Sequence, residues 1–177
     1  MPKPICQRLV DLIEDNADRL TQAWLADVKG RSETPTYHRY PDDLLYQRVH
    51  EVYRHLGQWV SRETTSADIA RVYTALGRQR HEEGFALSEV LLALILTRRH
   101  LWLLVREKGV LDSALVLQQA LDLSDRAVLF FDRAVYYTAL GYEQAQAEAV
   151  PKRTAALAEE LARPRRLARR AKRVAAG

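Results

Sequence analysis

The stretch LGRQRHEEGFALSEVLLALILTRRHLW, residues 76–102, decides how this chain folds. A basic segment that carries His81 ends at Gly84, and an almost unbroken apolar pattern follows, with His100 near its far end. Apolar residues on nearly every side of a helix are typical of a helix buried at the centre of a domain. We therefore expect a helix over about residues 87–108 that is the most buried element of the fold.

The rest of the chain also reads as helical. All six prolines lie outside residues 42–150, and proline breaks helix interiors. Apolar residues at helical spacing predict further helices over about 5–29, 42–62, Ser66 to just before Gly84, and 112–148, with a polar loop at 31–40. The chain has no internal repeat and no alternating pattern long enough to indicate a strand. The sequence predicts an all-α fold, a single helical-bundle domain of about five or six helices with a long C-terminal helix.

Two rows of apolar residues follow the last long helix. One row consists of Leu117, Leu121, Val128, Phe131 and Val135, and the other of Ala127, Phe130, Ala134 and Tyr137. We expect the first row to face the core. The second row suits a partner chain as well as it suits the domain's own core.

Basic residues are concentrated at the C-terminal end. The net charge of the 177 residues is +4, whereas residues 151–177 carry nine Lys and Arg against two Glu, which leaves −3 for residues 1–150. We predict a helical domain over 1–150 and a basic tail over 151–177 that is helical in part or disordered, with an interruption at Pro164. The candidate contacts to phosphates or another acidic partner are Arg163, Arg165, Arg166, Arg169, Arg170, Lys172 and Arg173.

The tail has two readings. It can bind nucleic acid, anionic lipid or an acidic partner without sequence specificity, or it can be a solvated extension that favours solubility. It carries no aromatic residue for base stacking, and no helix-turn-helix spacing accompanies it. The single Cys6, the lack of a signal peptide and the lack of a long apolar run predict a soluble, cytoplasmic protein.

No familiar catalytic motif occurs in the chain. The seven glycines form neither a P-loop nor a dinucleotide-binding pattern, and the GxSxG and HExxH motifs are absent. The nearest approach to a metal pair is Glu51 and His55, whose spacing also fits an ordinary surface pair on a helix. We therefore expect a protein that is not an enzyme.

A haem-binding or other ligand-binding helical sensor is the alternative. His81 and His100 are its candidate ligands or switch residues, together with Trp102 and Tyr137. His81 stands among charged residues at a helix end, and His100 follows two arginines, so both fit boundary positions better than ligand positions. We expect no cofactor, with haem as the alternative, and we retain His81 as a candidate protonation switch near neutral pH.

Several features together resemble a known family. They are Leu76–Gly77–Arg78, Arg80, Gly84 and Leu87 before the apolar helix, with LTQAWL at 20–25 and YPDDLL at 40–45. This pattern resembles the RsbR/RsbRD-type N-terminal domain of bacterial stressosome co-antagonists, over roughly residues 6–147.

The resemblance implies a globin-like sensor domain that generally lacks haem. Gly77, Arg80 and Gly84 are its structural signature in this chain, and His81 stands where the family commonly has a small residue. The family's domains dimerise and pass signals along the C-terminal helix. The resemblance thus implies a non-enzymatic regulatory domain that is a homodimer and acts by protein–protein interaction. In the family this domain usually precedes an output module; because this chain ends at Gly177, we expect it to act on a separate output protein.

Overall fold

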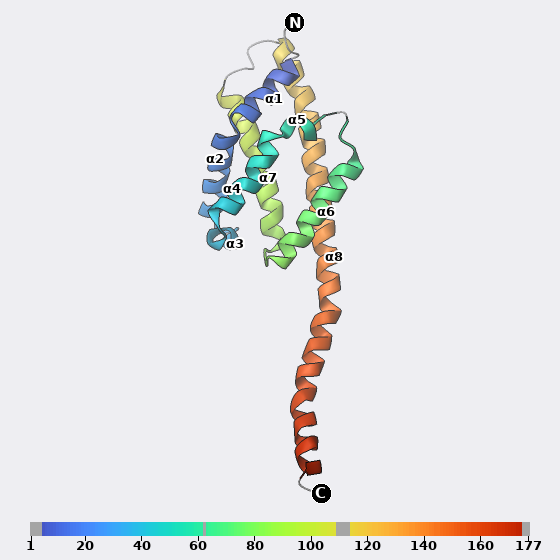
Figure 1. Ribbon diagram of the computed structural model, residues 1–177. Coiled ribbons are helices and arrows are strands. Elements are labelled where there is room, and N and C mark those ends of the chain that lie inside the picture. Colours follow the sequence, from blue (N-terminus) through green and yellow to red (C-terminus); the bar gives the residue numbers. More distant parts are fainter. Residues whose placement is uncertain (1–4, 62, 109–113, 175–177) are drawn as a thin grey trace.

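The computed structural model describes the backbone of residues 5–61, 63–108 and 114–174. These residues form helices and no strands. The helices are α1 (Ile5–Asp15), α2 (Ala17–Gly30), α3 (Pro35–Arg39), α4 (Asp42–Arg54), α5 (Leu56–Trp59), α6 (Ser66–Glu82), α7 (Leu87–Glu107) and α8 (Ala114–Val174). Figure 1 shows α8 lying along the body formed by the other helices and then projecting far beyond it. The all-α class and the long C-terminal helix are therefore confirmed.

Two of the expected helices are divided in the structure. The expected helix 5–29 ends at Asp15 and resumes at Ala17. The side-chain amide of Asn16 donates to the backbone carbonyl of Leu12 at 2.7 Å, and this hydrogen bond competes with continuation of the helix. The expected helix 42–62 is likewise divided at His55, between α4 and α5. The predicted loop at 31–40 contains the short helix α3. Within the described backbone, no helix is both long and apolar enough to span a bilayer.

Gly84 makes the turn from α6 into α7. Its φ is +81°, a conformation that L-residues rarely adopt. The Phe85 N–H donates to the Arg80 carbonyl at 3.0 Å, and the Gly84 N–H donates to the His81 carbonyl at 3.1 Å. These two bonds form the Schellman closure of a helix end. The turn buries Phe85 and directs the chain into α7.

The closest contact between two helices joins α6 to α8 at a pair of glycines. A β-carbon at Gly77 would lie 2.7 Å from the backbone nitrogen of Tyr142 and closer still to the Thr138 carbonyl oxygen. A β-carbon at Gly141 would lie 2.8 Å from the Cα of Thr74 and would also overlap the Thr74 carbonyl oxygen. The two backbones therefore touch, and only glycine fits at either position.

α7 is less enclosed than its sequence predicts. One side packs in the core through Val90, Leu96, Leu101 and other buried residues, and the indole N–H of Trp24 donates to the Ala93 carbonyl at 3.0 Å. Ile95 and Leu103, however, are exposed. No described element of the chain covers this side, so α7 contributes many buried residues but is not enclosed all round.

The two apolar rows of α8 are also arranged differently from the prediction. Ala127, Phe130 and Ala134 of the second row are buried in the domain's own core. In the first row Phe131 is buried, but Leu117, Leu121 and Val128 are exposed. Most of the row that we assigned to the core is therefore exposed. Apolar spacing predicts which residues share a face but does not say what covers that face.

The C-terminal part of α8 continues as helix to Val174. Pro151 and Pro164 both lie within it, so the interruption expected at Pro164 does not occur. Proline in a helix interior removes one backbone hydrogen bond and costs about 3 kcal/mol, and the Leu, Ala and Arg residues around Pro164 favour helix. The basic side chains from Arg163 to Arg173 lie outside the described side chains, and their predicted phosphate contacts stay a prediction.

Gly77→Ala tests the contact between α6 and α8. The added methyl group forces the two backbones apart, so we expect a loss of about 2 kcal/mol or more of unfolding free energy. This corresponds to a fall in Tm of roughly 4 °C or more in thermal denaturation.

Gly30→Ala is the matched control, because a β-carbon at Gly30 meets nothing within 4 Å. This control should be neutral or slightly stabilising. Equal Tm values for the two variants would contradict the close approach of the helices.

Candidate functional site

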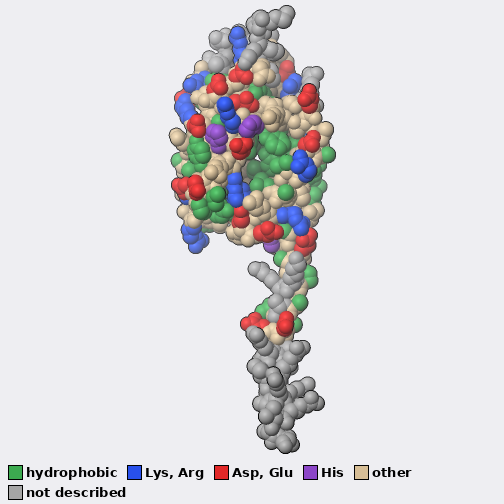
Figure 2. Space-filling model, viewed as in Figure 1, with side chains coloured by type: hydrophobic (Ala, Val, Ile, Leu, Met, Phe, Trp, Pro, Cys, Tyr) green, Lys and Arg blue, Asp and Glu red, His purple; other side chains and the backbone are tan. Residues whose placement is uncertain are grey.

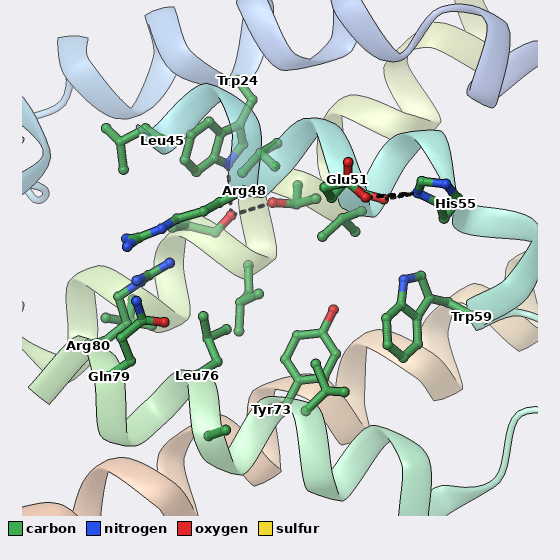
Figure 3. A pocket seen from close by; sticks show the side chains of 18 of the residues that line it. Trp24, Leu45, Arg48, Glu51, His55, Trp59, Tyr73, Leu76, Gln79 and Arg80 are labelled. Carbon is green, nitrogen blue, oxygen red and sulfur yellow. Dashed lines mark hydrogen bonds and ion pairs between the residues drawn. The ribbon is translucent and has the colours of Figure 1, made fainter. Parts of the chain in front are cut away.

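A cavity of about 630 Å³ lies between α4, α5, α6 and α7 (Figure 3). Most of its wall is apolar, including Trp24, Leu45, Val52, Trp59, Leu76 and Leu94. Figure 2 shows it as a hollow with hydrophobic side chains inside and with charged and histidine side chains along one rim. Its volume falls in the range of about 300–1,000 Å³ typical of small-molecule sites.

An aromatic cluster forms one end of the cavity. Trp59 stacks on Phe130 with ring centroids 5.4 Å apart, and Tyr73 meets both rings edge-on. Tyr73 is only 3% exposed, and its hydroxyl group points into the cavity (Figure 3). Burial raises the pKa of the Tyr73 hydroxyl well above its ordinary value, so this group is a neutral hydrogen-bond donor at any physiological pH.

Two arginines form the opposite wall. Arg48 donates to both oxygens of Glu83, at 3.0 and 2.7 Å, and Arg80 donates to the same carboxylate at 2.7 Å. Each guanidinium also lies over an aromatic ring, Arg48 over Tyr40 and Arg80 over Phe85. Two positive charges that line the cavity therefore share one carboxylate that does not line it.

Glu83 holds this cluster together. Burial alone would raise the pKa of Glu83, but the hydrogen bonds from Arg48 and the charge of Arg80 outweigh it, and the pKa lies below its ordinary value. Because the folded state lowers this pKa, the ion pairs stabilise the fold above about pH 4.5, and their contribution is lost as the pH falls through the lowered pKa.

The Glu51–His55 pair lies at the rim. The His55 Nδ1 is 3.1 Å from a Glu51 carboxylate oxygen, and both side chains are well exposed to solvent. This is the ordinary i,i+4 contact that the spacing suggests. Over residues whose side chains are described, no three His, Cys, Asp or Glu residues gather as a metal-binding group.

The structure does not bring the two candidate histidines together. His81 packs edge-on against Tyr142 of α8, with ring centroids 5.0 Å apart. The His100 Nε2 is 3.0 Å from an Asp27 carboxylate oxygen of α2. Neither histidine lines the cavity. Haem ligation through either residue and a switch at His81 stay predictions.

The other candidates are also dispersed. The Tyr137 hydroxyl is 3.2 Å from the Ser66 hydroxyl, and Trp102 packs against the core from a half-buried position. Of the signature residues, Arg80 lines the cavity, Gly77 contacts α8, and Gly84 forms the turn after α6. These three roles meet at one end of α6.

Sequence reasoning missed Arg48, Trp59 and Tyr73 as site residues. Their helical spacing marks Trp59 and Tyr73 as inward-facing, but a residue that packs in the core and one that lines a cavity share the same periodicity. Arg48 has the ordinary appearance of a charged residue on a helix surface. No local signal distinguishes any of these residues.

A family model described as the RsbT co-antagonist protein rsbRD N-terminal domain matches residues 18–157. The match covers most of the chain, and the chain therefore belongs to this family. No curated protein and no solved structure matches it. The resemblance that the sequence shows is confirmed, and the family is one of regulatory rather than catalytic domains.

Glu83→Gln tests the shared carboxylate. The change leaves two neighbouring guanidinium groups without a counter-charge, so we expect a loss of about 2 kcal/mol of unfolding free energy at pH 7. The difference from wild type should shrink below about pH 4.5, where Glu83 takes up a proton in the unfolded state, and should be lost as the pH falls through the lowered pKa of the folded state. Urea unfolding at a series of pH values measures both quantities.

Glu82→Gln is the control, because Glu82 is the exposed neighbour on the same helix. It should cost little at any pH. A constant difference between Glu83→Gln and wild type down to pH 3 would contradict the assigned role of Glu83.

Proposed function

We propose that this chain is a non-enzymatic regulatory domain of the stressosome co-antagonist type, which forms a homodimer and passes a signal along α8 to a separate output protein. Membership of the family supports the regulatory role. The observation that carries the proposal is a row of exposed apolar residues on α8.

This row, which we call the α8 seam, consists of Leu129, Tyr136, Val150 and Leu157. They lie at seven-residue intervals, and Glu143 occupies the missing position. All four apolar side chains are exposed, with Leu129 at 51% and Leu157 at 60%. The seam lies opposite the buried face formed by Ala127, Ala134, Thr138 and Ala145. A seven-residue apolar repeat is the pattern by which two helices wind around each other.

α7 extends this exposed surface. Arg98 of α7 donates to Asp132 of α8 at 2.9 Å, so the outer faces of the two helices meet there. Ile95 precedes Arg98 by one helical turn, and Leu129 precedes Asp132 by one helical turn, and both are exposed. Two such helices from each of two copies would form a four-helix interface around a two-fold axis.

The projecting part of α8 also favours a second copy of the chain as the partner. The described side chains from Val150 to Glu160 are all exposed, so this length of helix has no support from the body. An unsupported helix is only marginally stable in water and gains stability from packing of an apolar face. A second copy aligned in parallel supplies the same seam along the whole length and places both C-terminal ends together. The paired ends then offer one platform to the output protein.

Leu157→Glu and Leu129→Glu test the seam. Each change places a charge at the interface between the two copies, and we expect the dimer dissociation constant to rise about tenfold or more. Glu143→Leu completes the apolar repeat and should tighten the dimer. Light scattering coupled to size-exclusion chromatography over a dilution series measures all three constants.

Gln22→Glu is the control, because it adds the same charge at an exposed position on α2. It should leave the dimer unchanged. A wild-type protein that stays monomeric at all concentrations, or three seam variants that behave alike, would contradict the proposal.

A further inference from the structure

We propose that the cavity between α4, α5, α6 and α7 binds a small amphipathic carboxylate, and that this ligand is the signal to which the domain responds. Binding of the carboxylate concerns the cavity alone, whereas the role of this ligand as a signal rests on the proposed function. The size of the cavity is the first indication of a ligand. Protein interiors are close-packed, and a void of about 630 Å³ with an open mouth is far larger than packing defects leave.

Tyr73 supplies an unused hydrogen-bond donor inside the cavity. Its side chain is almost completely buried, its hydroxyl group points into the hollow, and no described residue is its hydrogen-bond partner. The indole N–H of Trp59, beside it, is also without a partner in the described part of the chain. Both donors belong to residues that line the hollow, so they are free to donate to a ligand that accepts hydrogen bonds.

Arg80 supplies the charge. It is 6% exposed, lines the cavity, and makes one hydrogen bond, to Glu83. A guanidinium group carries five N–H donors, so most of the hydrogen-bonding capacity of Arg80 is unused. Glu83 is shared with Arg48, and neither Glu83 nor the buried Glu89, whose charge also acts on Tyr37 of this wall, lines the cavity, whereas both guanidinium groups do. A planar, singly charged carboxylate fits a guanidinium group in both shape and charge.

The remaining wall selects an apolar body. Trp24, Leu45, Val52 and Leu76 offer no charge and no unused polar group toward the hollow. Among the described side chains, Glu51 is the one carboxylate that lines the cavity, and it lies at the rim and is paired with His55. A ligand with its carboxylate at Arg80, an uncharged body along the apolar wall and a neutral hydrogen-bond acceptor at the Tyr73 end satisfies each group in turn.

α6 gives such a ligand a route to α8. Tyr73, Leu76 and Arg80 lie on its cavity face, whereas Thr74 and Gly77 contact α8. Because the backbones of α6 and α8 touch at Gly77, a displacement of α6 by a ligand cannot be absorbed by side chains at that contact. The displacement of α6 therefore moves α8, the helix that carries the α8 seam.

The test uses decanoate and its neutral counterpart 1-decanol with the full chain at pH 7. Two of the three tryptophans, Trp24 and Trp59, line the cavity, so intrinsic fluorescence reports occupancy, and calorimetry gives the dissociation constant. We expect saturable binding of decanoate that is about tenfold or more tighter than binding of 1-decanol. Arg80→Gln should weaken decanoate binding by a similar factor and leave 1-decanol binding unchanged, whereas Arg78→Gln, outside the cavity, should change neither.

Tyr73→Phe keeps the test decisive if Arg80→Gln fails to fold. It removes only a hydroxyl group that has no partner among the described residues, so Tm should stay the same or rise. Binding of 10-hydroxydecanoate, whose terminal hydroxyl group can accept a hydrogen bond at the Tyr73 end, should weaken about two- to tenfold, whereas binding of decanoate should not weaken. Tyr53→Phe is the matched control, because the Tyr53 hydroxyl is buried but donates to the Thr97 carbonyl at 2.8 Å. It should lower Tm and leave binding unchanged.

Two results would overturn the inference. Failure of both probes to bind the folded protein would remove the cavity as a ligand site. Equal affinities for the two probes, with no effect of Arg80→Gln or Tyr73→Phe, would assign the site to neutral apolar molecules instead. Binding is also measured with Leu157→Glu, so that loss of the dimer and loss of ligand binding are recorded separately.

Discussion

The contact between the backbones of α6 and α8 at Gly77 and Gly141 is the constraint on which the rest of the structure depends. Each glycine occupies a position where a β-carbon would overlap a carbonyl oxygen of the opposite helix. This contact fixes α8, the longest helix of the described chain, against the body. It also fixes which face of α8 is buried, and therefore leaves the α8 seam exposed on the opposite side.

α6 connects the two functional surfaces of the domain. One face carries Tyr73 and Arg80 into the cavity, and the other carries Gly77 against α8. The Schellman turn at Gly84 then places Phe85 under Arg80, where the aromatic ring packs against the guanidinium group. The stretch that decides the fold in the sequence is thus also the stretch that lies between the cavity and α8.

Sequence reasoning could predict the helical class, the family and the break at Gly84, because apolar periodicity, glycine and capping chemistry are local properties. It could not predict which row of α8 meets the core, since both rows are apolar and the choice depends on where α6 crosses. It marked His81 and His100 by residue type, but each packs against a neighbouring helix outside the cavity. Arg48 and Tyr73 gain their roles only from the tertiary arrangement.

The central claim is that Gly77 and Gly141 form a single contact. A double-mutant cycle of Gly77→Ala and Gly141→Ala tests it most directly, by urea unfolding of the two single variants and the double variant. Once one methyl group has separated the helices, the second has little left to disrupt. The account predicts that the double variant loses less unfolding free energy than the sum of the single losses, by about 1 kcal/mol or more. Additivity within about 0.5 kcal/mol would contradict it.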